Sequence, residues 1–249
     1  AIGSFHERPV SPKLREFFSA LWLHEMPLAP VPPIIVAPDG TIDLQWIDGL
    51  LRVAGPDKEP TAEIVPAGAT VIGFRFRPAA AAAWLQVSAR ELLGERPLLE
   101  EIWGPRAKRL ANQIWKTQKG SDLVTAIEDA LAENPPDARA DVTMNAAYAL
   151  VEAGSPPGVP LAPWLARALG MSERTLRRRF DESYGYGPKT LERILRYQRF
   201  MRLSRTSSSS MAVLAAEAGY SDQAHLVRES KRLTGNTPTR HLRAETKQQ

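Results

Sequence analysis

Two similar helix-turn-helix segments follow one another near the C-terminus, and their repetition constrains the fold more than any other feature. The first spans Leu161–Phe180 and the second spans Met211–Ser230. In each segment, apolar residues recur at helical spacing until a glycine, Gly170 or Gly219, interrupts the pattern. A helix-capping residue and a second amphipathic helix then follow. One such unit is common in helical proteins, but two copies with matching core, turn and arginine positions indicate DNA binding.

The second helix of each unit is predicted to face DNA. In the first unit, four arginines fall within six residues around the buried positions Leu176 and Phe180. The arginine fork fits the edge of guanine or a phosphate, whereas the alternative is a solvated basic face. The second helix is chemically mixed: Gln223 suits an adenine edge and Val227 a thymine methyl. His225 is as well explained by simple exposure as by a contact. The expected helix caps are Ser172 in the first unit and Ser221 or Asp222 in the second.

Pro188–Leu203 separates the two units and has the pattern of a single helix, with proline at its start. Sixteen helical residues span roughly 24 Å. Successive major-groove segments lie roughly 34 Å apart, so such a strut could hold two reading helices against one face of a duplex. One chain could then read two adjacent grooves.

Residues 138–242 resemble the DNA-binding domain of AraC/XylS-family transcription regulators. The resemblance lies in LARALGMSERTLRRRF, GPKTLERILRYQRF and AAEAGYSDQAHLVRESKRLTGNTPTRHL. It implies seven helices, of which the third and sixth enter the major groove and the fourth links them. Carried over by position, the DNA-contacting residues are Arg174, Arg177 and Arg178, then Gln223, Ala224, His225, Val227 and Arg228. Ser230, before Lys231, departs from the aromatic residue usual there, which implies looser packing at that corner.

Charge divides along the chain as the motifs do. From Ala138 onward there are 18 Lys and Arg against 10 Asp and Glu, whereas Ala1–Asp137 has 14 against 18. The basic excess is therefore local to the predicted DNA-binding domain. With NPPD at 134–137 as linker, the expected domains are 1–134, for effector binding or dimerisation, and 138–249, for DNA.

Several classes are excluded on composition. The chain has no cysteine, which removes disulfides, thiolate metal sites and thiol nucleophiles. It has no apolar run long enough to span a bilayer, and its first residues lack the apolar segment of a signal peptide. We therefore expect a cytoplasmic, nucleoid-associated protein without membrane contact, metal or cofactor.

The N-terminal region begins as short β-branched or aromatic segments separated by Gly, Pro and Asp, and continues as helices up to Asn134. Asp39-Gly40 and Asp48-Gly49 are hairpin signals. The predicted strands are 19–25, 33–40, 41–48, 50–55, 62–66 and 70–78, and the predicted helices begin after Pro78, one of them at 88–95.

This region also resembles the sensor-like domain that precedes such DNA-binding domains in a subgroup of bacterial regulators. APDGTIDLQW, VAGPDKEP and VIGFRFRPAAAAAWL carry the resemblance, although relatives often have glycine where this chain has Ala79. It implies a small, cupin-like β-barrel with helices and no particular ligand. The whole chain is thus expected to be α+β.

Asp43, Trp46, Arg75 and Arg77 are the residues of this domain that could bind a ligand. An arginine near Asp43 could clamp a carboxylate or phosphate, but a cross-strand ion pair is the simpler interpretation. Tryptophans could line an apolar pocket or simply fill the core. The two histidines of this domain, His6 and His24, lie 18 positions apart and do not supply the ligand cluster that a metal-dependent barrel enzyme needs, so no enzyme is expected.

The sequence favours a sequence-specific transcription regulator of double-stranded DNA, with a first domain that senses a small molecule or forms a homodimer. The alternative is a constitutive DNA-binding or architectural protein whose first domain is only a protein-interaction module. A β-barrel enzyme fused to a DNA-binding domain is the third class, against which the shortage of histidine argues.

Overall fold

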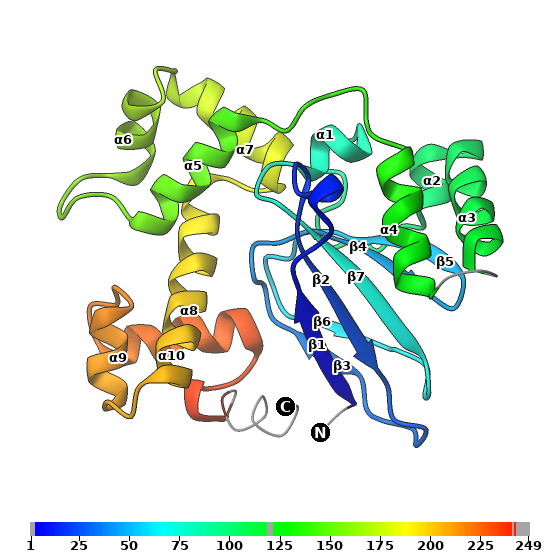
Figure 1. The fold of residues 1–249 in the computed structure, drawn as a ribbon. Helices are drawn as coiled ribbons and strands as arrows, with labels where there is room; N and C mark the ends of the chain where they lie inside the picture. Colours follow the sequence, from blue (N-terminus) through cyan, green and yellow to red (C-terminus); the bar gives the residue numbers. More distant parts are fainter. Residues whose placement is uncertain (1–2, 119–121, 241, 243–249) are drawn as a thin grey trace.

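The computed structural model describes residues 3–118, 122–240 and 242 of the chain, and it has the α+β architecture expected (Figure 1). An open antiparallel sheet forms in the first half, with strand order β1-β2-β7-β4-β5. A separate antiparallel ribbon pairs β3 with β6. The strands are β1 (Ser4–Arg8), β2 (Phe18–Glu25), β3 (Ile34–Val36), β4 (Asp43–Ile47), β5 (Leu50–Ala54), β6 (Thr61–Glu63) and β7 (Thr70–Phe76).

The expected barrel is not closed by the described strands. Strands β1 and β5 lie at opposite edges of the sheet and do not pair with each other. Helices cover one face instead: Leu44 and Phe74 of the sheet share a fully buried core with Trp84, Ile114 and other helical residues. Alternating apolar residues predict which face of the sheet is buried. They do not predict what covers it, because a layer of helices buries that face as well as a closed barrel does.

Of the two dipeptides predicted to form hairpin turns, one forms such a turn and the other does not. Asp48 and Gly49 both have positive φ, 48° and 87°, and join β4 to β5 as expected. The hairpin expected at Asp39-Gly40 is wrong, because β3 pairs with β6 rather than with β4. The Asp39 carboxylate accepts hydrogen bonds from the backbone N–H and the hydroxyl of Thr41, which makes a local turn without strand pairing.

Among its described residues, the first half has one short 3-10 helix among its strands and four α-helices after them. They are η1 (Pro12–Leu14), between β1 and β2, and then α1 (Ala81–Leu85), α2 (Leu99–Trp103), α3 (Pro105–Gln118) and α4 (Leu123–Glu133). The helix expected at 88–95 is wrong; this segment is a series of turns. Ala79 adopts a left-handed φ of 63°, a conformation that glycine adopts without strain.

The second half is helical and has its own core. Its helices are α5 (Val142–Ala153), α6 (Leu161–Ala168), α7 (Glu173–Tyr184), α8 (Pro188–Thr206), α9 (Met211–Glu217) and α10 (Gln223–Thr234). Residues 238–240 are also helical, and residues 243–249 of the expected domain lie outside the described residues. No helix within the described ranges is both long and apolar enough to cross a bilayer.

Helix α8 connects the two helix-turn-helix units, as expected of a strut (Figure 1). Its residues Leu191, Ile194 and Leu195 are buried in a core shared with α5, α6, α7, α9 and α10. Arg193 of α8 forms an ion pair of 2.9 Å with Glu229 of α10, and both side chains are largely buried. The helix therefore contacts both units.

The two halves also touch. Gly40 lies against Leu191, Ile194 and Leu195 of α8, and the Gln198 amide donates a hydrogen bond of 2.9 Å to the Pro38 carbonyl. A second contact joins the segment before α2 to the end of α7, where the Ala89 N–H donates to the Glu182 carbonyl at 2.8 Å.

Candidate DNA interface

The first reading helix, α7, begins as the sequence predicts. Gly170 has a φ of 64° and ends α6, and the Ser172 hydroxyl then caps α7 by accepting a hydrogen bond from the Thr175 N–H at 3.1 Å. Leu176 and Phe180 are buried against the other helices. The opposite side of the helix is therefore left for solvent or DNA.

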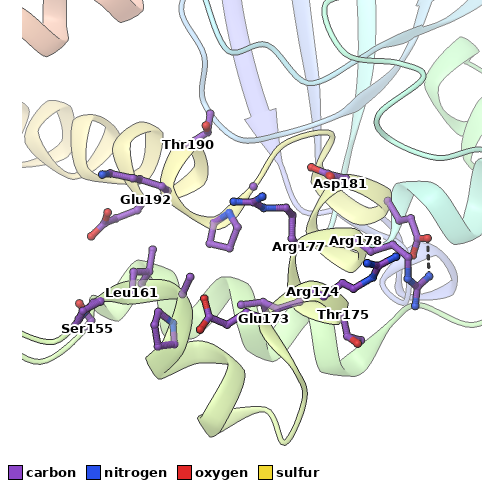
Figure 2. A pocket seen from close by; sticks show the side chains of 18 of the residues that line it. Ser155, Leu161, Glu173, Arg174, Thr175, Arg177, Arg178, Asp181, Thr190 and Glu192 are labelled. Atoms are coloured by element: carbon purple, nitrogen blue, oxygen red, sulfur yellow. Dashed lines mark hydrogen bonds and ion pairs between the residues drawn. The ribbon is translucent and has the colours of Figure 1, made fainter.

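Arg174, Arg177 and Arg178 are all exposed and line one groove beside α7 (Figure 2). The groove has a volume of about 1450 Å³ and lies between α6, α7, the start of α8 and residues 88–90. Arg178 also forms an ion pair of 2.7 Å with Glu182, one helical turn further on. Because both partners are exposed, such a pair contributes little and can be exchanged for a phosphate.

Arg179 does not belong to this set. It is the fourth of the arginines that the sequence places around buried Leu176 and Phe180, but its guanidinium forms two hydrogen bonds, of 2.6 and 2.8 Å, with the Asp141 carboxylate. Asp141 is also the N-cap of α5. Arg179 therefore holds α7 against α5, and its donors are used within the fold.

The second reading helix, α10, is capped by Asp222, whose carboxylate accepts from the His225 N–H at 2.7 Å. Gln223, Ala224 and Arg228 are exposed, whereas His225 and Val227 are half-buried. The His225 ring contacts the Ser221 hydroxyl and the edge of the Tyr220 ring. Residues of the turn before α10 therefore orient the His225 imidazole.

Ser230 is fully buried, although sequence analysis expected looser packing there. Its hydroxyl donates to the Asn236 carbonyl at 2.8 Å and lies 3.2 Å from the Tyr197 hydroxyl of α8. The aromatic ring that fills this corner therefore comes from α8, and the serine is hydrogen-bonded to it. Sequence reasoning missed this contact because Tyr197 and Ser230 are far apart in the chain.

The four residues proposed for ligand binding do not form one site. Asp43 and Arg75 are directly paired across β4 and β7, with 3.3 Å between their side chains, as the simpler interpretation predicted. Trp46 is buried on the helix-covered face beside Trp115. Arg77 donates to the Arg15 carbonyl and, together with Arg75, lines a cavity of about 160 Å³ that neither Asp43 nor Trp46 lines.

The Asp43 carboxyl is buried beside charged and hydrogen-bonding side chains. Burial raises the pKa of its carboxyl by more than the neighbouring Arg75 lowers it. The Trp22 indole N–H also donates to this carboxylate at 3.0 Å. Burial lowers the pKa of Arg75, but Asp43, Asp39 and Glu7 raise it by more, so its guanidinium remains charged.

In the described geometry, two helix-turn-helix units, each with a capped second helix, are joined by the single helix α8. A family model described as a helix-turn-helix domain matches residues 165–244, and one described as a domain of unknown function, DUF6597, matches residues 6–97. These matches identify the second half of the chain as a helix-turn-helix domain and assign no function to the first half.

Among solved structures, ToxT from Vibrio cholerae is similar, with 12% identity and a TM-score of 0.48, covering 96% of this chain and 97% of that one. ToxT with a bound unsaturated fatty acid has 13% identity and a TM-score of 0.47, covering 96% and 95%. A probable AraC-family regulator from Rhodopseudomonas palustris has 21% identity and a TM-score of 0.36, covering 42% and 97%. No curated protein matches the chain.

Proposed function

We propose that the chain is a sequence-specific regulator that reads two adjacent major-groove segments, one with α7 and one with α10. The observation that carries this proposal is the packing of α8 against both units, which fixes the separation of two similarly built reading helices. The base- and backbone-contacting residues are Arg174, Arg177 and Arg178 of α7, and Gln223, Ala224, His225, Val227 and Arg228 of α10.

The roles of these residues differ with their chemistry. Exposed arginines of α7 suit guanine or phosphate, whereas Gln223 suits an adenine edge and Val227 a thymine methyl. Replacing a base-reading residue by alanine should cost about 1–3 kcal/mol on the cognate site and relax specificity there. Loss of a phosphate contact should weaken binding to all sequences alike.

The experiment compares Arg177→Ala with Arg179→Ala on cognate and random duplexes. Arg177→Ala should weaken binding to the cognate duplex more than to the random one. Arg179→Ala is the control, because it removes the same charge from the same helix at a position that pairs within the fold. Equal losses for both variants on both duplexes would contradict the assignment of α7 as a reading helix.

Domain boundaries at 1–134 and 138–249 complete the proposal, with the first domain acting as sensor or dimerisation module in the cytoplasm. A cavity of about 190 Å³ supports a sensor role. It lies between the sheet and the β3–β6 ribbon, and both Asp43 and Arg75 line it. The competing architectural role, in which this domain binds only proteins, predicts that no small molecule alters DNA binding.

The charges of this cavity favour a small cationic or neutral ligand over an anion. Three arginines line it, and each already pairs with a lining carboxylate: Arg52 with Glu63, Arg75 with Asp43, and Arg96 with Asp57. Asp39 adds a fourth carboxylate to the lining. Phenethylamine should therefore raise the melting temperature of the protein more than hydrocinnamate, its carboxylate counterpart. Stabilisation by hydrocinnamate alone would contradict this assignment.

A further inference from the structure

One loop of the N-terminal region, Ser88–Arg90, is docked on the end of the first reading helix. The Ala89 N–H donates to the Glu182 carbonyl at 2.8 Å, and Ala89 is fully buried. Gly185, which ends α7, has a φ of 81°, and a Cβ at this position would lie 2.8 Å from the Ala89 carbonyl oxygen. Backbone therefore packs on backbone here, and the loop has a fixed position relative to α7.

Arg90 follows this contact and lines the same groove as the exposed arginines of α7. Its side chain is 73% exposed, and its ion pair with Asp181 has a separation of 3.8 Å. Charged hydrogen bonds are typically 2.7–2.9 Å long, so this pair is loose. By contrast, Arg179 is 26% exposed and makes two short hydrogen bonds to Asp141.

We propose that Arg90 is a DNA-backbone contact contributed by the N-terminal domain, binding a phosphate beside the major-groove segment that α7 reads. This inference rests on the proposed function of α7. Recognition helices contact bases through their N-terminal residues, whereas Arg90 lies beside Asp181, in the second half of α7. Arg90 therefore faces the edge of the DNA major groove, where phosphates rather than base edges are available.

The contact makes the N-terminal domain part of the DNA-binding surface. As long as residues 88–90 stay docked on α7, the domain adds affinity that is independent of sequence, because a phosphate carries no sequence information. When phosphate replaces Asp181 as the partner of Arg90, only a loose pair of 3.8 Å is lost, in which the arginine is exposed and the aspartate half-buried.

The test measures affinity of the full chain for cognate and random duplexes over a range of salt concentrations. Arg90→Ala should reduce the slope of log affinity against log salt by about 0.9, the value for one phosphate contact. Between 1 M and 0.1 M salt that slope corresponds to roughly an eightfold loss, expected on both duplexes. Arg90→Lys should keep most of the slope, since lysine also binds phosphate as a point charge.

Two further variants separate this role from others. Arg109→Ala removes an equally positive, exposed side chain from α3, on the far side of the N-terminal region from α7, and should leave the slope unchanged (Figure 1). Asp181→Asn breaks the ion pair but keeps Arg90, so it should bind DNA at least as tightly as the original chain.

Two results would overturn the inference. One is a slope for Arg90→Ala that equals that of Arg109→Ala. The other is a loss for Asp181→Asn as large as that for Arg90→Ala, which would mean that Arg90 acts only by docking. Arg177→Ala distinguishes these failures from failure of the proposed function: if it too leaves cognate binding unchanged, α7 does not read DNA.

Discussion

The packing of Ile194 in α8 offers the sharpest test of the strut. Ile194 is fully buried in the core of the helical half and also lies against Gly40 of the first half. It makes no contribution to the exposed groove beside α7. Ile194→Ala should therefore weaken two-site DNA binding without removing a DNA contact.

The expected loss of stability follows from the volume removed. Replacing isoleucine by alanine deletes three carbon groups, each worth about 0.8 kcal/mol when buried, or about 2.4 kcal/mol in transfer free energy. The cavity left behind raises the total to about 3–4 kcal/mol. Ile194→Val deletes one group and should cost about 1 kcal/mol. Ile194→Gly should add about 1 kcal/mol to the alanine value through helix propensity.

Denaturant unfolding measures these losses, and binding to a full site and to each half-site measures the coupling. Under conditions where each variant is still folded, the gain in affinity of the full site over either half-site should be reduced least by Ile194→Val, more by Ile194→Ala and most by Ile194→Gly. A graded loss of stability with an unchanged full-site advantage would refute the claim that the packing of α8 sets the spacing.

Two other predictions concern stability. Arg179→Ala should lower the free energy of unfolding by about 1–3 kcal/mol, because it leaves the Asp141 carboxylate without its charged partner, and chemical denaturation measures this. Burial raises the pKa of the Tyr184, Tyr186 and Tyr220 hydroxyls above 10.0, so the unfolded chain loses these protons first as pH rises. Stability should therefore be unaffected below pH 10 and should fall above it, by about 1.4 kcal/mol per pH unit for each tyrosine, in unfolding experiments at alkaline pH. A flat stability up to pH 12 would contradict that assignment.

Local signals in the sequence were sufficient for the helical half. Glycine stops, polar caps and apolar spacing operate within a few residues, and Gly170, Ser172 and Asp222 all take the roles predicted for them. The hairpin at Asp48-Gly49 was predictable for the same reason, since both residues tolerate positive φ.

Features that depend on distant segments, such as strand pairing, could not be predicted from the local sequence pattern. Strand β1 is mostly exposed at the sheet edge and shows no alternation of apolar residues. Pairing of β3 with β6 depends on a partner about 25 residues away, whereas Asp39-Gly40 gives only the local turn. The segment at 88–95 has the composition of a helix, but its Ala89 N–H bonds to the distant Glu182 carbonyl instead.

The candidate DNA site was partly predictable. Exposure of Arg174, Arg177 and Arg178 follows from their spacing around buried Leu176. Neither the pairing of Arg179 with Asp141 nor the position of Arg90 in the groove beside α7 could be predicted, because both depend on contacts between distant segments.

Footprinting of the full chain on its cognate duplex tests the central claim most directly. Two reading helices held by α8 should protect two major-groove segments on one face of the DNA, about 10 base pairs apart from centre to centre. Arg177→Ala should weaken protection of one segment, and Arg228→Ala should weaken protection of the other. Protection confined to a single segment in the original chain would contradict the account, because it would mean that only one of the two helix-turn-helix units reads DNA.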